Sequence, residues 1–216
     1  MSVQEEKKKY ESVTKLTENP FLNLYQIDAI ARDGAHFNYY FASRNDGEHI
    51  KHKTHSMQPE GMAIYALTED GTKIVLVRQY RYPINDYIYE LPAGLIEPDE
   101  NASEAAVREM AAVREMAEET GLTLKVYEGG AACLRRGFFL AQGMTDESGS
   151  MIYGTVAEET GRQQLENTED MEVVLADREM VKKILKNERI TVRCAYLLMQ
   201  FLQADPKTPF RFLEIE

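Results

Sequence analysis

Three glutamates near the middle of the chain have a spacing suited to metal chemistry. Glu115, Glu118 and Glu119 stand at positions i, i+3 and i+4, so on a helix their side chains share one face. Three like charges side by side repel one another, and a hard divalent cation bound by their oxygens would offset that repulsion. The spacing therefore predicts a Mg²⁺ or Mn²⁺ site, and the alternative is an acidic helix face that is simply solvated.

The sequence on either side favours the metal site. A predicted strand at residues 87–91 leads into a Pro-Ala-Gly turn at residues 92–94. Asn101 followed by Glu104 has the pattern of a helix cap. Gly121 stands where the end of a helix favours a left-handed residue. We therefore expect a strand, a loop and one long helix that ends at Gly121.

These residues resemble the signature motif of the Nudix hydrolases. The match runs through Gly94, five residues, Glu100, seven residues, Arg108-Glu109, and then Glu118-Glu119-Thr-Gly-Leu. The resemblance implies a divalent metal and hydrolysis of a diphosphate. It also implies that the carbonyl of Ala93, just before the first glycine of the motif, is a metal ligand.

A tandem repeat makes this motif six residues longer than the family pattern. Residues 106–111, AVREMA, are repeated at once as residues 112–117. Counted from Gly94 the first copy has the family spacing, and counted back from Gly121 the second copy has it. Six residues turn a helix by about 600°, so the first copy faces about 120° away from the second.

This rotation decides which copy we assign to the metal. Residues three and four places after Glu109 are alanine and valine, which cannot bind a metal. We therefore assign metal binding to Glu115, Glu118 and Glu119, and expect Arg108 and Glu109 in an added helical turn or a bulge.

Two further stretches, RQYRYP at residues 78–83 and YELPAG at residues 89–94, resemble the sugar-diphosphate branch of the family and most closely its ADP-ribose pyrophosphatases. An arginine at a strand end presents a fork of donors to a diphosphate, and we favour Arg81 over Arg78 for that contact. The resemblance implies that Glu90 contacts substrate or a metal-bound water.

Acidic residues in two later loops are also candidates. Residues 143–147 resemble the family's Ser-Pro-Gly-x-x-x-Glu loop, with Ala-Gln in place of Ser-Pro, and this makes Glu147 a candidate substrate contact. In the related pyrophosphatases a glutamate on the loop corresponding to residues 158–170 is the base or a further metal ligand. Glu166 and Glu169 are both candidates, of which Glu169 aligns better with the Glu-Asp before the next strand.

Composition narrows the classes of partner. The chain has 216 residues, a formal net charge of −11 and a pI near 5.0, which argue against nucleic acid or an anionic membrane surface. Cys133 and Cys194 have no CxxC or histidine cluster nearby, so we expect thiols rather than a disulfide or zinc site. The absence of a membrane-length apolar run or a signal-like start predicts a cytoplasmic protein.

The periodicity predicts strands and helices. Two alternating stretches, residues 21–31 and 35–43, predict a hairpin, after a frayed polar lead. Residues 61–67 and 73–79 predict a second hairpin, and short strands are expected at residues 124–128, 131–134, 151–157 and 171–175. Helical spacing follows at residues 178–186 and 192–203.

The family resemblance implies that these elements form an α+β fold. It implies a mixed sheet between helices at residues 59–216, and a small antiparallel β subdomain at residues 1–58. In the related enzymes such a subdomain is shared across a homodimer and helps to hold the base of the substrate. We therefore expect a homodimer.

The function that the resemblance implies is hydrolysis of ADP-ribose to AMP and ribose 5-phosphate. Another nucleotide sugar, such as UDP-glucose or GDP-mannose, is the alternative within the enzyme class. A catalytically silent ADP-ribose-binding protein is the alternative outside it, because of the repeat.

Overall fold

The computed structural model describes residues 8–96, 104–157 and 161–215. Its contacts divide the chain into two compact units. The N-terminal unit comprises Met1–Gln58 with Gly137–Ser148, and the large unit comprises Pro59–Arg136 with Gly149–Glu216. The predicted cap at Asn101 and the motif residue Glu100 lie outside the described residues.

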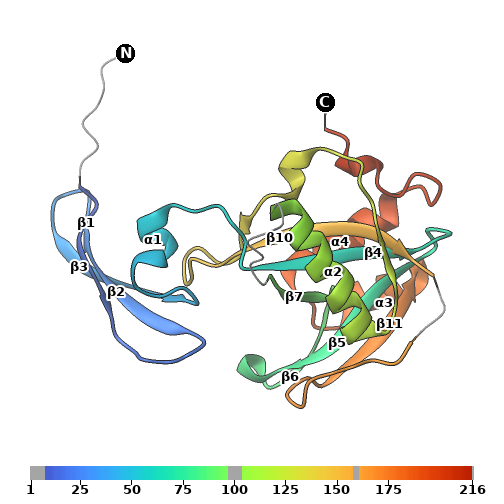
Figure 1. Cartoon of the computed structure of the whole chain (residues 1–216), viewed down its shortest axis with the longest axis horizontal. Helices are drawn as coiled ribbons and strands as arrows, with labels where there is room; N and C mark the ends of the chain where they lie inside the picture. Colours follow the sequence, from blue (N-terminus) through green and yellow to red (C-terminus); the bar gives the residue numbers. More distant parts are fainter. Residues whose placement is uncertain (1–7, 97–103, 158–160, 216) are drawn as a thin grey trace. The chain divides into compact units, whose positions relative to one another are not determined.

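The N-terminal unit contains a three-stranded antiparallel sheet in the order β1-β2-β3 (Figure 1). Its strands are β1 (Tyr10–Lys15), β2 (Asn23–Ile30) and β3 (His36–Ser43), followed by the short helices η1 (Gly47–His49) and α1 (Lys51–Thr54) and later by β9 (Phe138–Phe139). Tyr25 and Phe41 stack with ring centroids 5.3 Å apart and bury a small core with Ile50. The predicted hairpin is confirmed, whereas β1 replaces part of the predicted frayed lead.

The large unit is built on a mixed sheet in the order β11-β5-β4-β10-β8, with β6 beside β5 and β7 beside β4 (Figure 1). The strands are β4 (Gly61–Thr68), β5 (Lys73–Arg81), β6 (Asp86–Glu90), β7 (Ala93–Leu95), β8 (Leu124–Val126), β10 (Ser148–Val156) and β11 (Met171–Asp177). β10 is parallel to β4, while β11 is antiparallel to β5. The tight turn between β4 and β5 contains Gly71 at φ +69°, a conformation that favours glycine.

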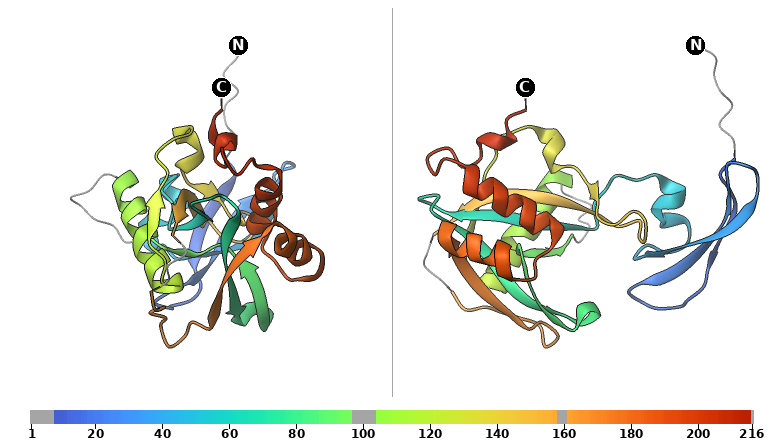
Figure 2. Two further views of the ribbon diagram at one scale, coloured as in Figure 1. Left: turned by 90° about the vertical axis from the view of Figure 1, so that its right-hand side faces the viewer. Right: turned by 180° about the vertical axis from the view of Figure 1, so that it is seen from behind.

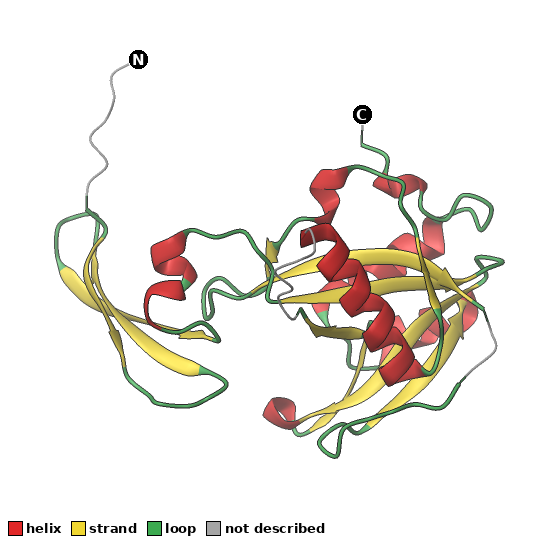
Figure 3. Cartoon of the chain, viewed as in Figure 1, coloured by secondary structure: helices red, strands yellow, loops and turns green. Residues whose placement is uncertain are grey.

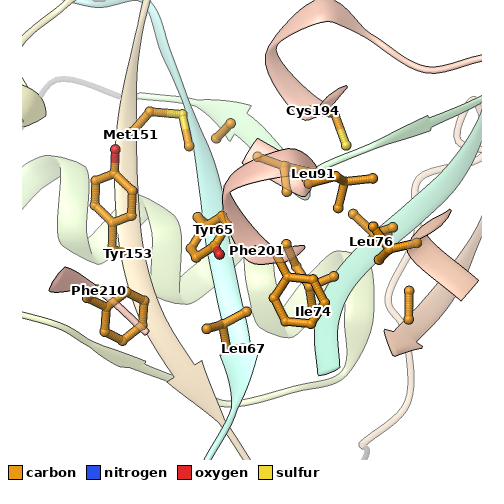
Figure 4. Close-up of a cluster of buried hydrophobic side chains, with 14 of the residues drawn as sticks. Tyr65, Leu67, Ile74, Leu76, Leu91, Met151, Tyr153, Cys194, Phe201 and Phe210 are labelled. Atoms are coloured by element: carbon orange, nitrogen blue, oxygen red, sulfur yellow. The ribbon is translucent and has the colours of Figure 1, made fainter. Parts of the chain in front are cut away.

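Helices cover both faces of this sheet (Figures 2 and 3). They are α2 (Glu104–Thr120), α3 (Arg178–Asn187) and α4 (Val192–Gln203), with 3₁₀ turns η2 (Tyr82–Ile84), η3 (Ala132–Arg135) and η4 (Arg211–Leu213). Tyr65 and Leu67 of β4 pack with Phe201 of α4 in one core (Figure 4), and Ile64 packs with Met116 of α2 in the other. Because β4 is buried on both faces, its sequence is apolar almost throughout.

The comparison of the two repeat copies shows how α2 accommodates six extra residues. The helix is continuous over its 17 residues, so the first copy forms an added turn rather than a bulge. Met116 of the second copy is 0% exposed, whereas the equivalent Met110 of the first copy is 60% exposed. This is the result expected when equivalent residues lie about 120° apart around the helix.

One local prediction is wrong. Residues 132–135 form the 3₁₀ turn η3 instead of a strand, and the guanidinium of Arg135 donates to the backbone carbonyls of Tyr127 and Gly129. The turn is thus joined to the preceding segment through a side chain, which satisfies backbone carbonyls there without strand pairing. In the part of the chain that the structure describes, no helix combines the length and apolar character needed to cross a membrane.

Candidate active site

The C-terminal half of α2 packs against the short strand β7. The carboxylate of Glu119, a residue only 5% exposed, accepts a hydrogen bond of 3.0 Å from the backbone N–H of Ala93. At Gly94 a Cβ atom would lie 2.0 Å from Cδ of Glu115. Glycine is therefore needed at position 94 to admit the Glu115 carboxylate beside the strand.

Burial dominates the electrostatics of these two acids. Burial raises the pKa of Glu119 to about 8. The hydrogen bond from the N–H of Ala93 lowers this pKa, and so does the charge of Arg81. The charges of Glu115 and Glu169 raise it. The pKa of Glu115 is also raised, mainly by burial, with Arg114 acting in the opposite direction. The buried Glu119 and the half-buried Glu115 thus lie close enough for the negative charge of one to disfavour the ionised form of the other.

Arg114 is the nearest compensating cation. Its guanidinium donates to Glu115 Oε1 at 2.8 Å and to Glu118 Oε2 at 2.9 Å. Glu118 is more exposed than the other two, with 40% of its side-chain surface accessible. Arg114 belongs to the second repeat copy, and the family spacing marks its position, but the sequence does not indicate this pairing.

The donor set is chemically suited to a hard divalent cation, although the residues are not yet arranged around one. Carboxylate oxygens of Glu115 and Glu119 lie beside β7, and oxygen ligands are the kind that Mg²⁺ prefers. Within the described residues, no group of three or more His, Cys, Asp or Glu side chains is arranged to hold a metal ion. An ion shared by Glu115 and Glu118 would have to replace the guanidinium of Arg114.

The loop before β11 packs on the end of α2. Gly161 N donates to Gly121 O at 2.7 Å, Gln164 N donates to Glu118 O at 2.8 Å, and Gln163 Nε2 donates to Glu119 O at 2.7 Å. At Gly121, which has φ +71°, a Cβ would lie 2.6 Å from the carbonyl oxygen of Gly161. The C-terminal end of α2 therefore holds the loop before β11 in place through these contacts.

Glu169 is the loop acid whose charge acts on the buried pair. It raises the pKa values of both Glu115 and Glu119. Its Oε2 accepts a hydrogen bond of 2.8 Å from the backbone N–H of Glu166, whose own side chain is exposed. The arrangement supports Glu169 over Glu166 as the loop residue that belongs to the site.

The two arginines predicted to bind substrate both contact other side chains of the protein. Arg81 Nε lies 2.5 Å from Glu90 Oε2, and the charge of Arg81 reaches Glu119. Arg78 instead stacks its guanidinium 4.3 Å from the ring centroid of Tyr87. Of the two arginines, Arg81 is thus the one joined electrostatically to the glutamates.

Glu147 lies in the N-terminal unit, not in the unit that contains the other candidates. Its Oε1 lies 3.2 Å from Arg44 Nε, and its backbone N–H donates to Thr145 Oγ1 at 3.1 Å. Its role in binding substrate stays a prediction.

Known proteins resemble this chain in sequence and in fold. The model of the NUDIX domain matches residues 57–193. Nudix hydrolase 2 of Caenorhabditis elegans is 35% identical over 136 residues, which cover 59% of this chain and 56% of that protein. The ADP-ribose pyrophosphatase of Bacillus subtilis (strain 168) is 31% identical over 150 residues, which cover 67% of this chain and 72% of that protein. The crystal structure of an ADP compounds hydrolase shares the fold, with a TM-score of 0.57 at 19% identity, and the match covers 89% of this chain and 93% of that one.

The chain therefore belongs to the Nudix family, since the family match covers more than half of it. Family membership and the pyrophosphatase relative indicate a hydrolase that acts on pyrophosphate bonds. The resemblance drawn from the motif and the predicted α+β fold, with its mixed sheet between helices and its small antiparallel sheet, are both confirmed. The chain spans little more than half the length of the C. elegans relative.

Glu119→Gln tests the burial of this carboxylate. An acid with a higher pKa in the folded than in the unfolded protein takes up a proton on folding, so stability falls as pH rises from 4.5 to about 8. With EDTA present, we expect the variant to exceed the wild type in unfolding free energy by about 2–4 kcal/mol above pH 8, and by much less at pH 5. Urea denaturation across this pH range measures the difference.

Glu118→Gln is the matched control, because Glu118 lies on the same helix face but is more exposed. Its stability should stay within about 0.5 kcal/mol of the wild type at every pH. A Glu119→Gln variant that is less stable than the wild type above pH 8 would contradict the assignment of Glu119 as an uncompensated buried acid.

Proposed function

We propose that the chain hydrolyses the diphosphate bond of ADP-ribose, or of a related nucleoside diphosphate sugar, to AMP and ribose 5-phosphate in the first case. The observation that supports this most is the placement of Glu115 and Glu119 against β7 at Ala93 and Gly94 of the Nudix motif, with the charge of Glu169 acting on both. The 31% identity to an ADP-ribose pyrophosphatase favours this substrate class.

Mg²⁺ or Mn²⁺ completes the site in this proposal. Glu115, Glu118 and Glu119, with the carbonyl of Ala93, would hold the ion, because three neighbouring carboxylates, one of them buried, need a compensating cation. When bound, the ion neutralises the diphosphate and makes water more acidic.

The remaining steps belong to side chains of the large unit. Arg81 would hold the diphosphate from the opposite side, sharing its donors between the phosphate oxygens and Glu90. Glu90 in turn would keep the guanidinium oriented. Glu169 would accept the proton of the attacking water, since its carboxylate acts on both buried glutamates from the loop.

A product assay tests the activity. With Mg²⁺ or Mn²⁺ and ADP-ribose, we expect the wild type to release AMP and ribose 5-phosphate, and EDTA to abolish the release. Glu119→Gln should lower kcat by at least about a hundredfold, since a catalytic metal contributes several kcal/mol to the transition state. Glu179→Gln on α3, where the exposed Glu179 pairs with Lys182, should leave kcat unchanged. Faster release of UMP from UDP-glucose, or of GMP from GDP-mannose, would move the assignment to another nucleotide sugar.

The repeat gives a specific reason to consider a silent ADP-ribose-binding protein. Arg114 already pairs with two of the three glutamates, and the added turn separates Gly94 from the second copy by six more residues than in the family pattern. Tight binding of ADP-ribose without product would favour this alternative.

Deletion of residues 106–111 tests the effect of the repeat. The deletion restores the family spacing from Gly94, and Ala105 then takes the helical position of Ala111, so the packing of Met116 and Glu119 should persist. We expect turnover of ADP-ribose to rise in the deletion variant, measured as AMP release at equal protein concentration. Equal turnover in the two proteins would show that the repeat does not affect the site.

We also propose a homodimer formed through the N-terminal sheet. Strand β3 leaves three aromatic side chains more than one-third exposed, namely Phe37, Tyr39 and Tyr40. Large apolar side chains grouped on one strand are typical of an interface.

The oligomeric state tests this proposal. Analytical ultracentrifugation should give the mass of a dimer for the wild type and a shift toward monomer for Phe37→Asp, because the charge would be buried without a partner. Tyr196→Asp, at an exposed aromatic residue of α4, is the control and should stay dimeric. A monomeric wild type would contradict the proposal.

A further inference from the structure

The loop before β11 is tied to strand β6 by one tyrosine. The backbone carbonyl of Asp170 accepts a hydrogen bond of 2.9 Å from Tyr80 N, which extends the pairing of β5 with β11 by one residue. The side chain of Asp170 accepts a second hydrogen bond, of 2.6 Å, from the hydroxyl of Tyr87 on β6. Asp170 is therefore held through both its backbone and its side chain.

The distance that this hydrogen bond spans explains why residue 87 is a tyrosine. β5 lies between β6 and β11 in the sheet (Figure 1), and Tyr87 pairs directly with Tyr80 of β5. Neighbouring strands are about 4.8 Å apart, so a β6 side chain must extend across the whole of β5 to reach the residue before β11. A tyrosine is long and rigid enough to do so, and its hydroxyl supplies the donor at the far end.

The ring of Tyr87 is itself fixed in place. The guanidinium of Arg78 lies 4.3 Å from its centroid, and the ring of Tyr80 meets it edge-on at 5.4 Å and 71°. Arg78 and Tyr80 are two residues apart on β5, so both project from the same face of the sheet. This contact also gives Arg78 a role other than the diphosphate contact considered from the sequence.

The anchored residue is the immediate neighbour of Glu169. Glu169 N donates to Glu166 O at 3.0 Å, and Glu169 Oε2 accepts from Glu166 N at 2.8 Å, so the turn before Asp170 is closed on itself. Whether this short turn stays closed depends on what holds its ends. Asp170 provides that hold on the side of Glu169.

We infer that Tyr87 is a positioning residue, which through its hydrogen bond to Asp170 keeps the Glu169 carboxylate directed toward Glu115 and Glu119. This inference rests on the proposed function, in which Glu169 accepts the proton of the attacking water. Tyr87 itself need not touch substrate or metal.

Tyr87→Phe removes the hydroxyl and keeps the ring that Arg78 contacts. We expect kcat for ADP-ribose to fall about fivefold with KM changed less than about twofold, because one partly exposed hydrogen bond is lost and substrate contacts are kept. Asp170→Ala should have a similar effect, and the double variant should be no slower than Asp170→Ala alone. Asp170→Asn, which keeps an acceptor oxygen, should retain more activity than Asp170→Ala. Tyr82→Phe, at the exposed tyrosine of the same hairpin, should match the wild type.

Amide hydrogen exchange provides a measurement that does not depend on turnover. The amide of Glu166 donates to the Glu169 carboxylate, so its exchange rate reports how often that carboxylate leaves its place in the turn. We expect exchange at Glu166 to be several-fold faster in Tyr87→Phe than in the wild type and in Tyr82→Phe.

The two measurements separate the possible outcomes. Unchanged exchange at Glu166 in Tyr87→Phe would overturn the inference whatever the activity, and faster exchange with unchanged kcat would show that Tyr87 holds the loop without positioning a group that matters to turnover. If the wild type releases no AMP from ADP-ribose, the proposed function fails, and exchange alone decides whether Tyr87 orients Glu169.

Discussion

The structure of the site depends on a carboxylate that has been moved out of water against the edge of a strand. Glu119 is covered by protein on nearly every side and receives one backbone N–H, from Ala93. That single donor does not replace the hydration that the ionised group loses, so burial raises its pKa. The neighbouring Glu115 can approach the same strand only because position 94 has no side chain.

Two arginines lie near this acid, and each interacts with two carboxylates. Arg114 pairs with Glu115 and Glu118, and Arg81 acts on Glu119 from β5 while paired with Glu90. Each arginine is shared between two carboxylates, so neither fully compensates the buried acid. A site left short of positive charge in this manner is ready for a further cation.

Much of the fold could be predicted because the relevant signals are local. The glycine at position 71, with its positive φ, marks the hairpin between β4 and β5, and the helical periodicity of residues 192–203 gives α4 with the bounds observed. Strand β1 was missed because its sequence, YESVTK, is polar and mostly exposed. The strand predicted at residues 131–134 is a 3₁₀ turn instead, and the Arg135 side chain joins it to carbonyls of the preceding segment, a contact that no local pattern indicates.

The candidate site could be predicted only in part, for a related reason. The motif and the helix period together indicate the face that contains Glu115 and Glu119. The pairing of Arg114 depends on its rotamer, and the contact between Tyr87 and Asp170 joins residues 83 positions apart. The association of residues 137–148 with the N-terminal sheet, through Ala42 N and Met144 O at 2.8 Å, is likewise a long-range contact without a local signature.

The position of Gly121 also determines how α2 tolerates a change in length. Its left-handed backbone and its contact with Gly161 fix one end of the helix, and the buried Met116 and Glu119 lie at fixed distances from that end. Duplicated residues therefore accumulate at the opposite end, where they protrude by about 9 Å and rotate without shifting the residues beyond them. Alignments of relatives that differ in helix length should accordingly be registered on this C-terminal glycine, and the gap should be opened near the N-terminal end of the helix.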